Sequence, residues 1–238
     1  MIFILASRLK TYIKDENDNR IPTALDDENS ILTNIKKYLN NTNKIVSVAN
    51  NENDFTTNEE RSQITFKSFY KTGFKFKEQI ILDARNKDNA KSILSDADVI
   101  ILNGGKCLCQ NDFFNEINLK DILKNKKGGI VIGISAGAMN LCNTIFNFPE
   151  ELKDKNDPLF LDGMSFCNDI IIPHFDGEQY QLDYNEIDIM NEYILPYSKK
   201  YEFIGFPNYS YILIDENNKK HYFGDIYKIS KGEIIKIQ

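Results

Sequence analysis

The stretch "GGIVIGISAGAMN", residues 128–140, places a run of branched apolar residues directly before Gly133-Ile134-Ser135-Ala136-Gly137. A Gly-x-Ser-x-Gly pattern that leaves a buried strand and enters a helix is typical of a nucleophile elbow, a strained turn that lifts the serine hydroxyl above the sheet. At such a helix start the N–H of Ala136 would face an oxyanion, and the helix dipole would favour the negative charge. The alternative is that Ser135 only caps the helix, since serine is a favoured N-cap residue.

Other short apolar runs rich in Ile and Val resemble the run before Ser135. They predict buried strands at residues 2–7, 44–49, 79–83, 98–103, 129–135 and 169–174. Apolar residues at helical spacing are clearest at residues 28–39, at 111–125 and after Ser135. Strands and helices therefore alternate, which predicts an α/β fold with a mostly parallel sheet that is covered on both faces.

The end of the chain has a different pattern. From Tyr201 onward, short alternating runs are separated by the turn signals "ENNKK" and "SKGE", which predicts antiparallel β-hairpins. Segment 15–20 is polar and predicts a loop, and residues 50–62 mix Asn, Glu and Thr ahead of another helix-like stretch. Neither segment resembles an interdomain linker. For 238 residues we expect a single domain, 1–238, in which residues 201–238 form a β-rich C-terminal part.

Composition narrows the classes of partner and compartment. Lys and Arg total 29 against 35 Asp and Glu, a net charge of −6, so the chain lacks the positive field that nucleic-acid binding requires. The four cysteines have no spacing typical of a zinc site, and we expect them to be reduced. The apolar start "MIFILASRLK" is too short for a signal peptide or a membrane span. We therefore expect a cytoplasmic protein with no membrane association and no metal.

A nucleophilic serine needs a base, and the chain has two histidines. His221 lies in "KKHYFGD", a predicted hairpin edge where a solvated role is the commoner one. His174 ends the apolar run "DIIIPH" and should therefore lie at the C-terminal end of a strand. Active sites of open α/β sheets lie at that edge, and Ser135 leaves its own strand there as well. The shared edge favours His174 as the base.

The other parts of a hydrolase site have several candidates. Gly104 and Gly105 directly follow the "DVIILN" strand, where glycine permits the close backbone approach that an oxyanion hole needs, although a Gly-Gly pair is also a common tight turn. A carboxylate should orient the imidazole. The residues themselves leave this choice open among six acidic positions, which are Glu150, Glu151, Asp154, Asp157, Asp169 and Asp176.

Taken together, these motifs resemble the family of serine peptidases that contains dipeptidase E (aspartyl dipeptidase) and cyanophycinase. The matching segments span residues 98–214, with a weaker match at "FILAS", and are "DVIILNGG", "NDFFNEI", "GISAGAMN", "FPEE", "IIIPHFD" and "FIGFPNYSYILI". The resemblance implies a fold similar to that of class I glutamine amidotransferases. That fold is a flavodoxin-like three-layer sandwich around a mostly parallel central sheet.

By position, the resemblance makes Ser135 the nucleophile and His174 the base, with Gly105 and Ala136 as oxyanion donors. The acid of the family then falls on Glu150, with Glu151 as a near alternative. The resemblance implies no cofactor.

The chain departs from dipeptidase E after the glycine pair, where Lys106 and Cys107 replace Asn-Thr. We expect Gly104 and Lys106 beside the substrate; Lys106 either holds a substrate carboxylate or faces water. The predicted function is a serine peptidase-like hydrolase that cleaves small peptides through a Ser-His-Glu triad and an acyl-enzyme. The alternatives are an esterase or other acyl hydrolase on the same fold, and a non-catalytic member that binds a ligand. The predicted partner is a small peptide, and a homodimer is compatible with the sequence.

Overall fold

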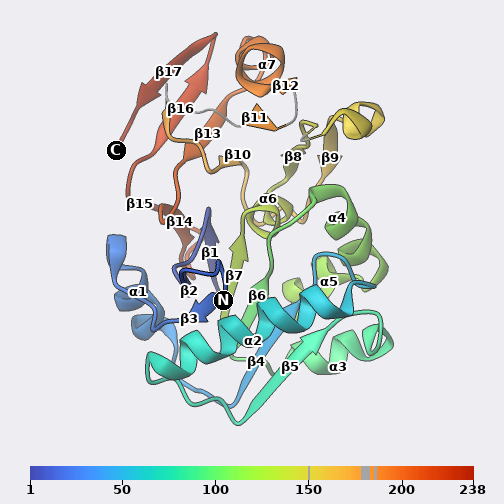
Figure 1. Ribbon diagram of the computed structural model, residues 1–238, viewed down its shortest axis with the longest axis vertical. Helices are drawn as coiled ribbons and strands as arrows, with labels where there is room; N and C mark the ends of the chain where they lie inside the picture. Colours follow the sequence, from blue (N-terminus) through green and yellow to red (C-terminus); the bar gives the residue numbers. More distant parts are fainter. Residues whose placement is uncertain (150, 178–182, 185–186) are drawn as a thin grey trace.

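The central feature of the computed structural model, which describes residues 1–149, 151–177, 183–184 and 187–238, is a seven-stranded sheet (Figure 1). Its strand order is β15-β14-β1-β7-β6-β4-β5, and the five strands from β1 to β5 in this order are parallel. Strands β14 and β15 are antiparallel and form one edge. The bounds are β1 Ile2–Ala6, β4 Lys44–Val48, β5 Glu78–Leu82, β6 Val99–Leu102, β7 Ile130–Ile134, β14 Tyr211–Ile214 and β15 Lys220–Phe223.

Helices cover both faces of this sheet, because its parallel strands are apolar on both sides. In β1, Ile2 and Ile4 pack in one core with residues of α1 and α2, whereas Phe3 and Leu5 belong to a second core with residues of α3, α4, α5 and α6. The helices are α1 Ile31–Tyr38, α2 Phe55–Lys71, α3 Ala90–Ser95, α4 Cys107–Glu116, α5 Leu119–Asn125 and α6 Ala136–Leu141. The predicted α/β sandwich of three layers is confirmed.

A second sheet of four strands lies at the upper end of the molecule in Figure 1, beside α7 Leu195–Ser198. Its order is β10-β13-β16-β17, in which β10 and β13 are parallel and the other pairs are antiparallel. The bounds are β10 Ile170–Pro173, β13 Phe203–Phe206, β16 Tyr227–Ser230 and β17 Glu233–Lys236. The chain passes directly from β13 in this sheet to β14 in the central sheet, so residues 201–238 contribute strands to both.

Smaller elements fill the connections. Three two-stranded sheets are formed by β2 Tyr12–Lys14 with β3 Arg20–Pro22, β8 Thr144–Phe146 with β9 Phe160–Asp162, and β11 Asp183–Tyr184 with β12 Ile187–Asp188. The 3-10 helices are Glu28–Ser30, Lys87–Asn89 and Leu152–Asn156, and Met190–Ile194 is a π-helix. Within the described residues, no helix is long and apolar enough to cross a membrane.

The structure differs from the sequence predictions at several points, and three of them concern a whole strand, helix or loop. The predicted strand at residues 169–174 forms as β10, but it pairs with β13 in the second sheet and not within the central sheet. The predicted helix at 111–125 is two helices, because Asn118 takes a left-handed conformation (φ 53°) between α4 and α5. The predicted loop at 15–20 is largely the turn of the β2–β3 hairpin, where Asp15 Oδ1 accepts hydrogen bonds from the N–H groups of Asn17 and Asn19.

Candidate active site

Ser135 stands on the turn between β7 and α6 in a strained backbone conformation (φ 51°, ψ −113°). Its side chain makes no capping hydrogen bond to α6, so it does not act as the helix cap that is the alternative interpretation of the motif. The flanking glycines are required sterically. A Cβ on Gly137 would lie 2.2 Å from the carbonyl oxygen of Leu102, and one on Gly133 would lie 2.6 Å from the carbonyl oxygen of Gly137. The geometry is that of a nucleophile elbow.

His174 directly follows β10 and meets this serine. The distance between His174 Nε2 and Ser135 Oγ is 2.9 Å. The histidine backbone is held in a left-handed conformation (φ 65°), and its N–H donates a hydrogen bond of 2.7 Å to Ser7 Oγ. Ser7 follows β1, the neighbour of β7, so the end of the central sheet holds both the serine and the backbone of its partner.

The other imidazole nitrogen contacts Asn208, a residue that the sequence analysis did not select. His174 Nδ1 lies 2.7 Å from Asn208 Oδ1 and 3.2 Å from Ser7 Oγ. An amide oxygen accepts a hydrogen bond, so this contact assigns the proton to Nδ1 and leaves the lone pair of Nε2 facing the serine hydroxyl. The arrangement is the one a general base requires, with Asn in the orienting position as in the Cys-His-Asn variant of the triad.

Strand pairing explains how Asn208 reaches the histidine. Strands β10 and β13 are parallel neighbours, Pro173 is paired with Phe206, and the two strands therefore end at the same place. Asn208 lies in the turn that follows β13, in which the N–H of Ser210 donates to the carbonyl oxygen of Pro207. The sequence signal for this position was the Pro-Asn turn in "FIGFPNYS" at the end of a strand.

Burial is the main cause that lowers the pKa of His174 below its ordinary value. The hydrogen bond to Asn208 acts in the opposite direction and raises the pKa, while the positive charge of Arg8 lowers it further. The imidazole is therefore neutral at neutral pH and able to accept a proton.

The acidic candidates do not contact His174 among the residues that the structure describes. Glu150, the residue that the resemblance selects, lies outside the described residues. Glu151 instead forms ion pairs with Lys106 (3.7 Å) and Lys153, and with Asp154 it forms a capping box at the 3-10 helix Leu152–Asn156. Asp176 is exposed two residues after the histidine.

Gly105 and Ala136, the predicted oxyanion donors, line the same cavity as Ser135. Neither N–H donates a hydrogen bond to any other described residue. Two hydrogen bonds from the Asn50 side chain fix the turn at Gly105. The side chain accepts from the N–H of Lys106 (3.1 Å) and donates to the carbonyl oxygen of the same residue (3.0 Å). Only glycine fits at 105, since a Cβ there would lie 2.4 Å from the Asn50 side chain and φ is 147°.

Two cavities flank Ser135. The first, which we call the aromatic cavity, has a volume of about 300 Å³ and is lined by Ala136, Met139, Phe146, Phe148 and Lys106 among others. The second, which we call the arginine cavity, has a volume of about 450 Å³ and is lined by His174, Arg8, Arg20, Arg61 and Gly104 among others. Ser135 lines both, so a substrate bound across the serine would occupy the two cavities.

The two predicted substrate-binding residues therefore lie in different cavities. Lys106 lines the aromatic cavity, where its Nζ is 3.0 Å from Asp154 Oδ1; this hydrogen bond raises the pKa of the lysine. Its charge is already matched by a carboxylate of the chain. Gly104 lines the arginine cavity, and its carbonyl oxygen accepts a hydrogen bond of 2.7 Å from Arg61.

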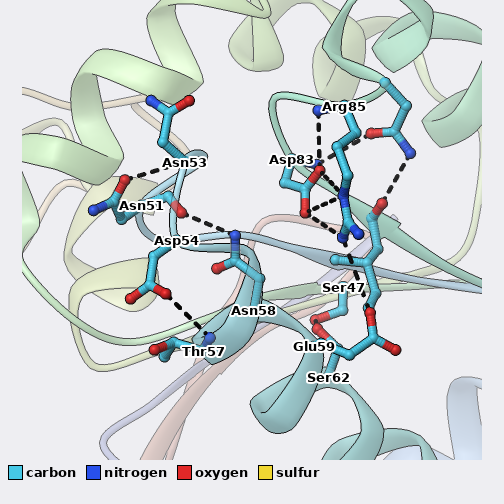
Figure 2. Close-up of polar contacts among 12 residues, drawn as sticks. Ser47, Asn51, Asn53, Asp54, Thr57, Asn58, Glu59, Ser62, Asp83 and Arg85 are labelled. Atoms are coloured by element: carbon cyan, nitrogen blue, oxygen red, sulfur yellow. Dashed lines mark hydrogen bonds and ion pairs between the residues drawn. The ribbon is translucent and has the colours of Figure 1, made fainter.

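Arg61 belongs to α2, and the start of that helix is fixed by side-chain hydrogen bonds (Figure 2). Asp54 is the N-cap and accepts from the N–H of Thr57 (3.1 Å), while Asn58 donates to the carbonyl oxygen of Asn51 (2.9 Å). Because serine, threonine, asparagine and aspartate side chains satisfy the unpaired N–H groups at a helix start, these contacts fix where α2 begins.

The other predicted features lie elsewhere or form no site. His221 pairs with Asp215 (2.9 Å) across the β14–β15 hairpin, as expected for a hairpin-edge residue. The four cysteines, all in the described part of the chain, form no disulfide. Across that same part, no group of three or more His, Cys, Asp or Glu side chains could hold a metal ion.

Comparisons with known proteins identify the family of the chain and structures with a similar fold. Residues 26–222 match the family model of peptidase family S51. The fold is similar to the crystal structure of a peptidase from an acI-B1 Actinobacterium, with a TM-score of 0.60 and 16% identity over 99% of this chain and 96% of that one. It is also similar to a putative peptidase E protein from Listeria monocytogenes EGD-e, with a TM-score of 0.60 and 12% identity over 93% and 96% of the two chains. No curated protein matches the sequence. The family match covers most of the chain, which therefore belongs to peptidase family S51.

Proposed function

We propose that this S51 peptidase is a serine peptidase that hydrolyses small peptides through Ser135, His174 and Asn208. The observation that carries the proposal is the line of hydrogen bonds from Ser135 Oγ through the imidazole to Asn208 Oδ1, at 2.9 and 2.7 Å. A neutral imidazole with its proton on Nδ1 is a base toward the serine hydroxyl. In this proposal the position beside Nδ1 belongs to Asn208, and the acid role that the resemblance assigns to Glu150, outside the described residues, stays a prediction.

The reaction takes place in two halves. Ser135 Oγ attacks the peptide carbonyl while His174 Nε2 accepts the hydroxyl proton, and the N–H groups of Gly105 and Ala136 stabilise the oxyanion. His174 then passes the proton to the amine, the C–N bond breaks, and the acyl group remains on the serine. A water molecule gives a proton to Nε2 and attacks the ester; the C–O bond then breaks, Nε2 returns the proton to Ser135 Oγ, and the acid is released.

The sizes of the two cavities support a preference for small peptides. Volumes of about 300 and about 450 Å³ are typical of pockets that bind small molecules. Purified protein should therefore cleave members of a dipeptide and tripeptide library, and Ser135→Ala should lower kcat by on the order of 10⁴ or more without loss of folding. Unchanged turnover by that variant would contradict the assignment of the nucleophile.

Two alternatives predict different results in the same assay. An esterase on this fold would hydrolyse an ester library and leave the peptides intact. A non-catalytic member would hydrolyse neither.

We also propose a cytoplasmic location, supported by four cysteines that remain thiols.

A further inference from the structure

The arginines of this chain are distributed very unevenly. The chain has 25 lysines but four arginines, which are Arg8, Arg20, Arg61 and Arg85. Three of the four line one cavity, the arginine cavity beside Ser135. Its lining within the described residues includes no aspartate or glutamate, although the chain as a whole has a net charge of −6.

All three of these guanidinium groups contact neutral groups of the chain. Arg61 donates a hydrogen bond to the carbonyl oxygen of Gly104 (2.7 Å), the residue before the predicted oxyanion donor Gly105. Arg8 donates to the hydroxyl of Tyr12 (2.8 Å), and Arg20 lies over the ring of the same tyrosine, 5.2 Å from its centroid. In the described part of the chain, Arg8 and Arg61 form no ion pair with a carboxylate, whereas Arg20 pairs with the exposed Glu60 at 3.3 Å.

The fourth arginine, Arg85, differs from the three that line the cavity. Arg85 lies outside both cavities and is matched by chain carboxylates, since its Nη2 lies 2.6 Å from Asp83 and 3.9 Å from Glu59 (Figure 2). Arginine presents a planar fork of donors that matches a carboxylate in two places. The other three arginines line a cavity that a ligand can occupy.

The position of His174 decides which half of a substrate occupies that space. The histidine must give its proton to the leaving amine, so the leaving group lies on the side of Ser135 that His174 borders. His174 lines the arginine cavity, and the described lining of the aromatic cavity does not include it. The acyl half of the substrate therefore lies in the aromatic cavity, and the leaving half lies among the arginines.

We propose that the arginine cavity binds a carboxylate on the leaving-group side of the scissile bond, supplied in a short peptide by its free C-terminus. This inference rests on the proposed function, because it uses the direction of proton transfer from His174. An acidic side chain on the leaving residue presents the same chemistry, so the test separates the two sources.

Binding to Ser135→Ala protein tests the inference without turnover. We would measure Kd by calorimetry for three matched sets of peptides: dipeptides ending in alanine, the same dipeptides as C-terminal amides, and dipeptide amides ending in glutamate. We expect the free acids to bind about tenfold or more tightly than the alanine amides, as for a hydrogen-bonded charge. Tighter binding of the glutamate amides alone would assign the carboxylate to the side chain. Equal binding of all three sets would overturn the proposal.

Variants then locate the effect. Two variants are made separately in the Ser135→Ala background, Arg61→Gln and Arg8→Gln. Each should reduce the ratio of Kd for the alanine amide to Kd for the free acid toward one. Lys67→Gln is the matched control, because Lys67 is exposed on the same helix as Arg61 and lies outside the cavity lining. A preference that persists in both arginine variants would also overturn the proposal, and Arg8→Gln gives an answer even if Arg61→Gln fails to fold. Labelling of the wild type by a neutral fluorophosphonate reports the reactive serine separately, so failure of the proposed function and failure of this inference give different results.

Discussion

His174 is the residue whose protonation state controls the proposed reaction. Burial and the charge of Arg8 lower its pKa, so the base form persists to a lower pH than for a free imidazole with a pKa of about 6.5. Activity should be lost as the pH falls through this lowered pKa, and the acid limb of kcat/KM should therefore lie below pH 6.5. A pH–rate profile on a cleaved dipeptide checks this, and a limb well above 6.5 would contradict it.

Asn208 offers a second test on the same imidazole. Asn208→Asp places a negative charge 2.7 Å from Nδ1, which stabilises imidazolium and should move the acid limb to higher pH. Asn208→Ala should lower kcat by roughly 10²-fold or more, because the ring loses the contact that fixes its tautomer. The His221→Ala variant is the control and should behave like the wild type. An unchanged pH profile in Asn208→Asp would exclude a role of Asn208 in orienting His174.

The sequence could predict Ser135 and His174 as candidate residues because each carries a signal of its own. The serine stands in a glycine motif after an apolar run, and the histidine ends another run after proline. The signal at Asn208 is weaker: it stands in a Pro-Asn turn after a strand, where asparagine is commonly a turn residue, and a carboxylate is the usual partner of a catalytic imidazole. Its contact with His174 depends on the pairing of β10 with β13, which brings together residues 34 positions apart.

At the scale of elements, the turn between β7 and α6 depends on its glycines. Gly137→Ala would force a Cβ to 2.2 Å from the carbonyl oxygen of Leu102 and should destabilise the protein by about 3 kcal/mol or more, at or above the upper end for overpacked sites. Gly128→Ala is the control for backbone strain alone, because Gly128 has a positive φ (72°), unlike Gly137, and no atom lies within 4 Å of the added Cβ. It should cost only about 1–2 kcal/mol of backbone strain. Urea denaturation of both variants measures the difference, and equal losses would contradict the steric account.

The strands of the central sheet could be predicted individually, but their assignment to sheets could not. Runs such as "DIIIPH" indicate a buried strand, yet an apolar run does not specify its neighbour. Strand β10 therefore appeared as part of the central sheet and in fact pairs with β13. The β2–β3 hairpin was missed because its strands are short and polar, with Ile13 and Ile21 exposed.

At the scale of the whole molecule, residues 201–238 are built into both sheets. They supply β14 to the central sheet, where Ile212 is fully buried, and β13 to the second sheet, where Phe203 is fully buried. A chain that ends at Lys200 loses both strands and Asn208 together. We expect it to show no cooperative unfolding transition by circular dichroism. A sharp transition with an unchanged midpoint would mean that the C-terminal part is a separate appendage.

The most direct test of the central claim, that His174 activates Ser135 as a nucleophile, is the rate of fluorophosphonate labelling with the adduct located by mass spectrometry. The wild type should be labelled at Ser135. His174→Gln, which retains a polar side chain but no base, should be labelled slower by two orders of magnitude or more, within the ~10²–10⁴ that a general base contributes. Ser7→Ala is the control, because Ser7 Oγ also lies within hydrogen-bond reach of His174, and it should leave the adduct at Ser135. A wild-type protein that is not labelled, or a His174→Gln protein labelled at the same rate, would contradict the claim.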